Sequence, residues 1–244
     1  MGLVVYIRRE AKEETMKNIN RDDEELAKAL RRSLNADYLR THIKEPLEEI
    51  ITPLLGGKTL FFPQCGDPIL VEIFTYIDLL GYLYKGRNLS SNAVEFMREY
   101  FGRVDKRYKE VGGLLYHALR HGLVHSATPK RIQLQNGMII DFLFAFVGQR
   151  QDYFKVSKSM EIQRTTGEKV DIYSLLLILH LLCEDLLSAL DKYAEDIRTN
   201  QELSEVFWEA FKTRRKPEKE KALLNKPYIQ DSDFAFMRKQ ISNL

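Results

Sequence analysis

The chain has 244 residues, of which 44% are hydrophobic and 30% are charged, enough for one sizeable core and one or two domains. Its 37 basic and 35 acidic side chains give a formal net charge of +2, so the whole molecule has no strong field that would attract nucleic acid or a membrane, and a charged partner must meet a local patch. With 13 glycines and 7 prolines, the composition excludes collagen-like, low-complexity and wholly disordered chains.

Cysteine usage and the apolar segments favour a cytoplasmic protein with no membrane partner. Cys65 and Cys183 lie far apart, and no Cys-x2-Cys spacing indicates a metal or redox site. The apolar stretch before Arg8 is too short for a secretory signal. The strongest apolar run, Ile172 to Cys183, is well short of the roughly 20 residues that span a bilayer. We interpret this run as a core helix.

Residues 1–65 are predicted to form an N-terminal helical arm and a connecting segment. The stretch from Arg8 to Leu39 has apolar residues at helical spacing and is expected to form one or two amphipathic helices. Another helix is expected from about Ala36 to Ile51, with Pro46 as a kink or a break. A short strand at Thr59 to Phe62 is a further expectation.

Residues 66–198 are predicted to form the main helical domain. Pro68 suits the first turn of a buried helix that ends at Gly86. Ser90 or Ser91 is expected to cap a second helix, which reaches about residue 101. A third helix is expected over residues 108–126.

The hydrophobic period changes within this domain, between about residues 130 and 172. Alternating residues lead to Asn136-Gly137, a signal for a two-residue type I′ hairpin, and a second hairpin is expected to turn near Gly167. The β structure is therefore a small insertion. Helical periodicity returns from Val170 to Ile197 and again over residues 201–212.

Residues 199–244 are predicted to form a C-terminal helical extension with a basic tail. Residues 212–226 hold seven basic and two acidic side chains. A solvated loop explains this segment, and a contact with nucleic acid is the alternative, because clustered Lys and Arg neutralise phosphates.

Three of the five histidines lie within nine residues of one predicted helix. His117, His121 and His125 are spaced four apart and would form a stripe along one helical face. A metal site is disfavoured, because no carboxylate lies between them and the first and last rings are roughly 12 Å apart along the axis. We expect neither a metal nor a cofactor.

The segment LLYHALRHGLVHSATP places Arg120 five residues before His125, with the polar His121 directly after the arginine. This pattern, at the end of an apolar helix, resembles the signature of the HEPN family (higher eukaryotes and prokaryotes nucleotide-binding): Arg, a polar residue, three to five further residues, then His. The resemblance covers about residues 66–198. It implies a mainly α protein, an HEPN-like helical bundle with a small β-hairpin insertion.

The function implied by the resemblance is a metal-independent endoribonuclease that acts as a homodimer, in the manner of a toxin or a phage-defence effector. Arg120 would hold the scissile phosphate, His125 would be the general acid or base, and His121 would orient the phosphate or supply a second donor. Tyr116 and Ser126 would contact the substrate. The implied partners are RNA or a nucleotide, a second copy, and an antitoxin or other protein regulator.

The chemistry of these residues is consistent with that role. RNA carries its own nucleophile, the 2′-hydroxyl, so its cleavage needs a base near neutral pKa, a cation and a proton donor. On an ideal α-helix, however, the side chains of Arg120 and His125 diverge by roughly 140°. One chain would then not assemble the site, and a two-fold dimer would complete it.

A non-catalytic nucleotide-binding, RNA-binding or protein-interaction module remains the alternative. In that case Arg120 could pair with Glu110 or Glu184, and the helix dipole alone would favour His125 near a C-terminus. Asp78 is expected to be a buried polar residue that needs a hydrogen-bond partner, and Tyr116 or Arg120 could be that partner. His180 is expected to be a core histidine that is hydrogen-bonded to the backbone or to a neighbour.

Overall fold

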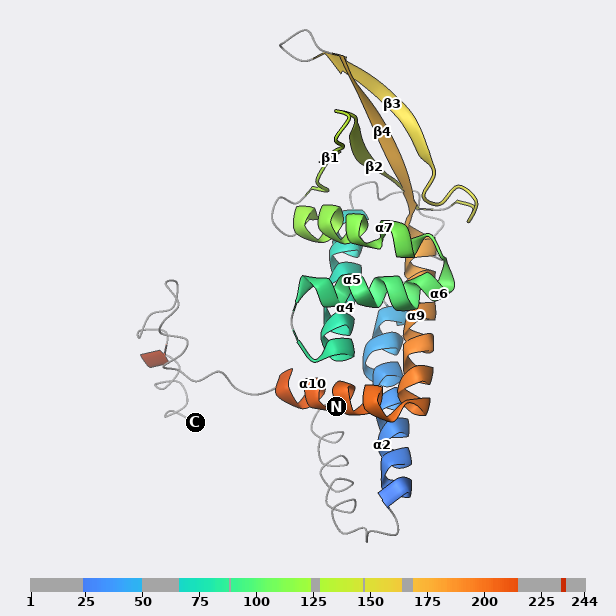
Figure 1. The fold of residues 1–244 in the computed structure, drawn as a ribbon, viewed down its shortest axis with the longest axis vertical. Helices are drawn as coiled ribbons and strands as arrows, with labels where there is room; N and C mark the ends of the chain where they lie inside the picture. Colours follow the sequence, from blue (N-terminus) through green and yellow to red (C-terminus); the bar gives the residue numbers. More distant parts are fainter. Residues whose placement is uncertain are drawn as a thin grey trace. The chain divides into compact units, whose positions relative to one another are not determined.

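The computed structural model describes residues 24–49, 66–87, 89–123, 128–146, 148–163, 169–214 and 234–235. The chain divides into two compact units, residues 1–210 and 211–244. The described part of the first unit is mostly helical and contains a four-stranded mixed sheet, which agrees with the expected mainly α class (Figure 1). The domain boundaries expected at residues 65 and 198 stay predictions.

Helical structure is continuous from Glu24 to residue 49. It comprises α2 (Glu24–Leu39), the π-helical turn η2 (Arg40–Lys44) and helical residues 45–49. A separate helix beginning at Ala36 was therefore the wrong interpretation, and Pro46 does not break the helix. Proline lacks an N–H group and would clash with the carbonyl four residues before it in an α-helix, and a wider π turn directly before Pro46 accommodates the ring. Residues 50–65, with the expected strand at 59–62, lie outside the described residues.

The next helices follow the predicted order. α4 (Gly66–Lys85) ends at Gly86, whose φ of +72° gives the expected glycine stop. α5 (Ser90–Phe96) continues into η3 (Met97–Phe101) and α6 (Gly102–Val104). The expected serine cap is wrong, because Leu89 occupies the N-cap position without a side-chain hydrogen bond. The Ser90 hydroxyl interacts with Tyr116 instead.

The helix that carries Arg120 begins where expected. It comprises α7 (Tyr108–Leu115), the π-helical turn η4 (Tyr116–His121) and helical residues 122–123. Residues 124–127 lie outside the described residues.

The sheet consists of two hairpins joined by a parallel pair. Its order is β1-β2-β4-β3, with antiparallel pairs β1/β2 and β3/β4 and the parallel pair β2/β4. Both hairpins were predicted, and the parallel pair was not. The strands are β1 (Ile132–Gln133), β2 (Ile139–Ala145), β3 (Val156–Gln163) and β4 (Lys169–Ile178).

The first hairpin turn differs from the predicted type. The N–H of Gly137 donates to the carbonyl of Leu134 at 3.0 Å, so Gln135 and Asn136 are the central residues of the turn. Gly137 follows them with φ +85°, whereas Asn136 does not have a positive φ. This is the pattern of a longer loop with a glycine after the turn, in place of a type I′ turn, which needs a positive φ at both central residues.

The interpretation of the apolar run at residues 172–183 as one core helix was also wrong. Residues up to Ile178 belong to β4, and α9 (Leu179–Thr199) begins only at Leu179. β4 is the strand between β2 and β3, so both of its edges are paired, and such a strand can be apolar on consecutive residues like a buried helix. The helix expected from Val170 therefore starts nine residues later.

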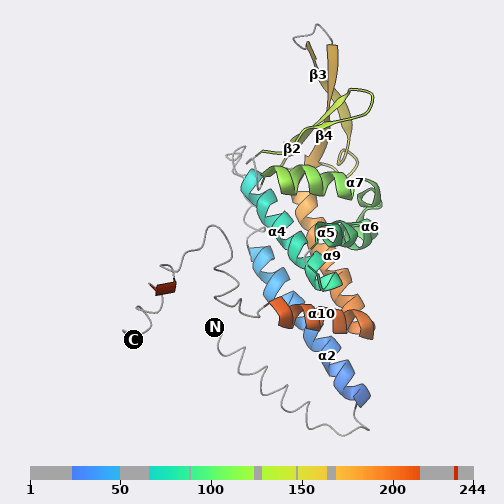
Figure 2. The ribbon, with the colours of Figure 1, turned by 60° about the vertical axis from the view of Figure 1, so that its left-hand side comes forward.

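The helical core of the first unit is rich in aromatic side chains. Phe96, Tyr100 and Tyr193 are buried and lie with ring centroids 4.9–5.4 Å apart. They join α5 and η3 to α9, and α2 lies alongside α9 in both views (Figures 1 and 2). α10 (Gln201–Arg214) follows α9, and Phe207 is buried against Tyr193. Among the described residues, no helix is long and apolar enough to cross a membrane.

Candidate functional site

Asp78 on α4 and two residues of the helix that carries Arg120 form a polar cluster. We call Asp78, Tyr116 and Arg120 the Asp78 cluster. Tyr116 Oη donates to Asp78 Oδ1 at 2.5 Å, and Arg120 Nε donates to Asp78 Oδ2 at 2.5 Å. Both partners proposed for Asp78 from the sequence are thus confirmed, because a carboxylate in an apolar helix has to be satisfied by a neighbouring element.

The partner of Arg120 was predicted wrongly in the structural alternative. Arg120 pairs with Asp78, whereas Glu184 lies 3.9 Å from Arg150. The side chains of Arg120 and Asp78 are each 25% exposed, so the pair lies at the border of the core and is reached by water. A guanidinium has five N–H donors in a planar fork, and the bond to Asp78 uses the one on Nε.

Tyr116 is a hydrogen-bond donor in this cluster, and His121 lies beside it on the same helix. Burial and the hydrogen bond to Asp78 raise the pKa of Tyr116 to about 12, so its hydroxyl stays protonated and acts as a donor. The ring of His121 lies edge-on to Tyr116 at 5.7 Å and 5.5 Å from the ring of His117. The structure therefore brings Tyr116, Arg120 and His121 onto one turn of the helix, η4.

His125 and Ser126 lie outside the described residues, so no distance joins them to Arg120. The turn that holds Arg120 is π-helical, so the divergence of roughly 140° that holds for an ideal α-helix does not apply to this turn. A π turn closes hydrogen bonds between residues five apart and holds more residues per turn. Such turns are rare and are enriched at functional sites.

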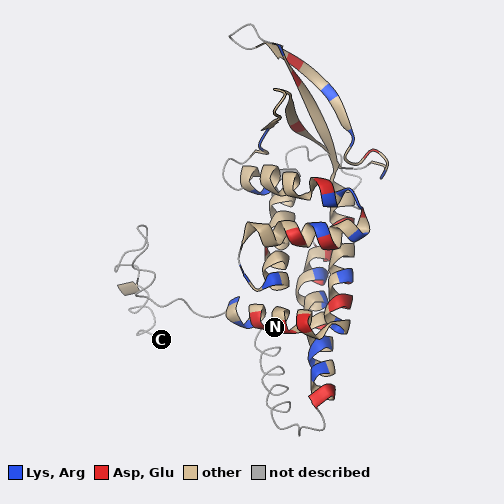
Figure 3. Cartoon of the chain, in the orientation of Figure 1, with Lys and Arg blue, Asp and Glu red and all other residues tan. Residues whose placement is uncertain are grey.

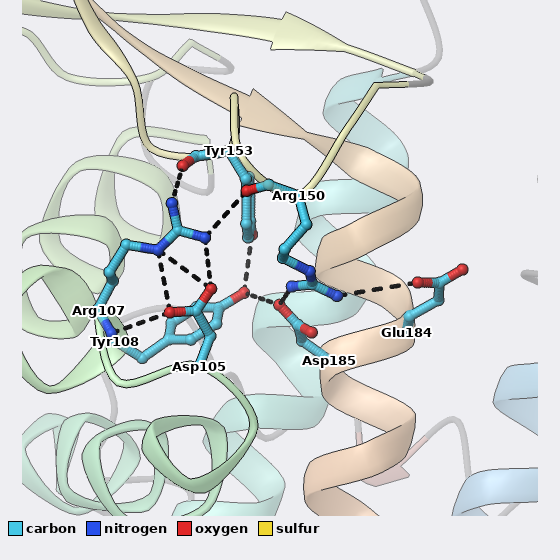
Figure 4. Close-up of polar contacts among 7 residues, drawn as sticks. All are labelled: Asp105, Arg107, Tyr108, Arg150, Tyr153, Glu184 and Asp185. Atoms are coloured by element: carbon cyan, nitrogen blue, oxygen red, sulfur yellow. Dashed lines mark hydrogen bonds and ion pairs between the residues drawn. The ribbon is translucent and has the colours of Figure 1, made fainter.

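A second polar cluster was not predicted from the sequence. Figure 4 shows its members, which come from the turn between α6 and α7, from the first residue of α7, from α9 and from the segment between β2 and β3. We call it the Asp185 cluster: Asp105, Arg107, Tyr108, Arg150, Tyr153, Glu184 and Asp185.

Asp185 is the centre of this second cluster and is fully buried. Its Oδ2 accepts hydrogen bonds from Tyr108 Oη at 2.8 Å and from Arg150 Nη1 at 2.6 Å. The hydroxyls of Tyr108 and Tyr153 are 2.7 Å apart. Asp185 Oδ1 has no hydrogen-bond partner among the described residues.

Burial sets the protonation of these groups. It raises the pKa of Asp185 above its ordinary value, against the opposite effect of the hydrogen bonds from Arg150 and Tyr108. Burial also raises the pKa of Tyr108 and of Tyr153 well above the ordinary range, and raises that of the Cys183 thiol to about 12. The tyrosines and Cys183 are therefore neutral and unreactive at physiological pH.

The Asp185 cluster holds the segment between β2 and β3 against the helices. Arg107 is paired with Asp105 at 2.6 Å and donates to the backbone carbonyls of Tyr153 and Arg150. Phe154, next in the chain, has φ +64°, an unfavourable conformation for a bulky residue that persists only where the surroundings impose it. We interpret this cluster as structural, because its central carboxylate has no access to solvent.

One sequence signal could have identified Asp185. It is one residue before Leu186 and lies three and four residues from Leu182 and Ala189, all buried, so a carboxylate stands within an apolar helical stripe. Tyr108 and Tyr153 gave no comparable signal, because they are 45 residues apart and meet only in the folded chain. His180, in contrast, is confirmed as a backbone-bound histidine, with Nδ1 2.8 Å from the carbonyl oxygen of Phe146.

Within the described ranges, no group of three or more His, Cys, Asp or Glu side chains is arranged to hold a metal ion. A scan of protein-family models, a search of curated proteins and a search of solved structures find no match to this chain.

Proposed function

We propose that this protein is a metal-independent endoribonuclease of the HEPN type, built as a homodimer around the helix that carries Arg120 and His125. The observation that supports the proposal is the orientation of Arg120. Its Nε is held by Asp78 at 2.5 Å, and its side chain is partly exposed. A guanidinium held at Nε can present its two Nη groups to a phosphate as a bidentate pair.

In the proposed reaction, the RNA supplies the nucleophile. His125 takes the proton of the 2′-hydroxyl, the 2′-oxygen bonds to phosphorus, and the 5′-oxygen leaves with a proton donated by His125 of the partner subunit. The products are a 2′,3′-cyclic phosphate and a 5′-hydroxyl end. Arg120 neutralises the charge that develops on the phosphate, and His121 supplies a second donor.

Tyr116 contributes to this site through Asp78 under the proposal. Its hydroxyl holds Asp78 in place at 2.5 Å, so it positions Arg120 through the carboxylate. Ser126 would contact the substrate beyond the described part of the helix. The further expectations are an HEPN-like bundle, a cytoplasmic toxin or phage-defence role, and an antitoxin or other regulator as partner.

The direct test is cleavage of a mixed RNA pool by the purified full chain in the presence of EDTA. We expect cleavage with 2′,3′-cyclic phosphate ends, and its loss in Arg120→Ala and in His125→Ala. His117→Ala and Arg98→Ala are matched controls, because both side chains are exposed and neither belongs to the proposed site. These controls should cleave like the parent chain, and circular dichroism should show that all variants are folded.

The second candidate is a non-catalytic module that binds RNA or protein. The ion pair with Asp78 favours it, because this carboxylate offsets the charge of Arg120 and weakens its attraction for a phosphate. If the folded chain binds RNA without cleaving it, or does not bind RNA, we would conclude that the protein is this non-catalytic module. If Arg120→Ala cleaves RNA as well as the parent chain does, the proposed site is neither a catalytic site nor an RNA-binding site.

A further inference from the structure

β3 is an open edge of the sheet. It lies at the end of the order β1-β2-β4-β3, and among the described strands it pairs only with β4. Seven of its eight residues are exposed. Figure 1 shows it on the side of β4 that faces away from β2. The outer backbone N–H and C=O groups of such a strand are a template for a further strand.

The side chains of β3 also favour pairing. Val156 and Met160 are 53% and 54% exposed, which is unusual for large apolar residues on an edge strand. Lys158 and the register shift between Lys158 and Met160 are features that restrict pairing with arbitrary strands. The edge therefore favours a partner strand that places a charge of opposite sign opposite each charged residue of β3.

β3 matches itself in one register. In an antiparallel pair with a two-fold axis between Ser159 and Met160, each Lys158 faces Glu161 of the other copy. Lys158 and Glu161 lie on the same face of the sheet although they are three residues apart on β3. The register shift between Lys158 and Met160 pairs them with Tyr173 and Asp171 on β4, which are two residues apart and so share a face. A parallel pair in equal register would instead place Lys158 opposite Lys158, which is unfavourable.

The neighbouring charges extend this match to β4. Lys158 pairs with Asp171 at 2.6 Å, and Glu161 pairs with Lys169 at 2.9 Å. Asp171 on β4 and Lys158 on β3 of one copy are then followed by Glu161 on β3 and Lys169 on β4 of the other copy. The sign of the charge alternates across these four adjacent strands. Figure 3 shows the single basic and single acidic positions along β3.

We propose that a second copy of this chain pairs antiparallel with β3 in this register and forms a continuous sheet across the two copies. The interface joins a surface with itself, as a two-fold dimer requires. One strand pair buries a small area, so the dimer depends on protein concentration and is not obligate. The pairing uses the edge of β3 and not the surface around Arg120 through which the proposed function forms its dimer. It is therefore a second interface, and losing it leaves the Arg120 dimer in place.

The test uses charge reversal and sedimentation velocity over a series of protein concentrations, without RNA. Lys158→Glu alone places Glu opposite Glu twice in the dimer, and Glu161→Lys alone places Lys opposite Lys twice. We expect each single variant to weaken the association step that depends on β3 by about tenfold or more. An equimolar mixture of the two variants restores opposite charges at both positions, so it should form a heterodimer at the parent affinity.

The mixture separates pairing from damage to the hairpin. Each single variant also loses its internal ion pair with Asp171 or Lys169, and mixing does not restore those pairs. Lys85→Glu is the matched control, because it removes an exposed ion pair to Glu95 with the same change in charge and should dimerise like the parent. A parent chain that is monomeric, single variants that associate as strongly as the parent, or a mixture that associates no better than the single variants would each overturn the proposal.

Discussion

Arg120 and Asp78, 42 residues apart in the chain, are joined by a 2.5 Å hydrogen bond from Nε to Oδ2. Both side chains are partly exposed, so water screens the pair, and we expect it to contribute about 1 kcal/mol or less to stability. Tyr116 donates to the other carboxylate oxygen. The carboxylate therefore fixes the direction of the guanidinium more than it stabilises the fold.

Asp78→Asn separates positioning from charge. The amide oxygen can still accept from Tyr116, but the negative charge beside Arg120 is gone. Under the proposed function we expect tighter RNA binding together with slower cleavage, because Arg120 is more attractive to phosphate and less well held. Fluorescence anisotropy with a short RNA at two salt concentrations and single-turnover cleavage measure the two effects. If neither affinity nor rate changes while the melting temperature falls, Asp78 has only a structural role.

Gly81 on α4 allows α4 and α5 to pack closely. A Cβ atom there would lie 2.5 Å from the backbone N and 2.6 Å from the Cα of Ala93, and the backbone of α5 would have to move. We expect Gly81→Ala to lower the free energy of unfolding by about 1–3 kcal/mol, measured by urea denaturation. Gly113→Ala is the control, because the nearest atoms are side chains at 3.4 Å and 3.6 Å, and it should be neutral or slightly stabilising.

The order of the helices could be predicted from local patterns, and the exact ends of several elements could not. Gly86 ended α4 as expected, because a glycine with positive φ is a local signal. The strand to helix change at Ile178 has no such signal, because residues 172–183 are apolar in both elements. Only the pairing of β4 with β2 and β3 makes residues 172–178 a strand, and that pairing is a property of the whole sheet.

The same distinction applies to the polar clusters. Asp78 was predictable, since a carboxylate in an apolar helix requires a partner and the sequence offered Tyr116 and Arg120. The Asp185 cluster joins residues from segments far apart in the chain, and neither Tyr108 nor Tyr153 carries a periodic or motif signal. The pair Arg120 and His125 stays a prediction of function, because His125 lies outside the described residues.

Asn35 connects α2 to α10 within the first unit. Its side chain is fully buried, and Nδ2 donates to the backbone oxygen of Ser204 at 3.1 Å and to its Oγ at 3.0 Å. We expect Asn35→Ala to cost about 1–3 kcal/mol of unfolding free energy, because two buried hydrogen bonds are lost. Ser204→Ala should cost less, since the backbone oxygen still accepts. A double-mutant cycle by urea denaturation measures the coupling, and purely additive costs would contradict a direct interaction.

Asp185 should be the most sensitive residue of the second cluster. Asp185→Ala leaves the buried Tyr108 hydroxyl without its acceptor and removes the partner of Arg150. We expect a loss of about 2–3 kcal/mol in the free energy of unfolding, since Arg150 is partly exposed and can be hydrated. Glu184→Ala is the matched control. Its carboxylate is exposed and 3.9 Å from Arg150, so a cost below about 0.5 kcal/mol is expected.

Asp185→Asn tests the charge of the same residue through the pH dependence of stability. Burial raises the pKa of Asp185 in the folded chain above its value in the unfolded chain, so the unfolded chain loses this proton at lower pH. The contribution of Asp185 to stability is then fully present below the unfolded pKa of about 3.9 and declines as the pH rises through the raised folded pKa. Asparagine does not titrate and can still accept from Tyr108. The difference in unfolding free energy, variant minus parent, should therefore increase with pH across this window and level off above it. Urea denaturation at a series of pH values measures this difference, and a constant difference across the series would show that the folded pKa of Asp185 is not raised.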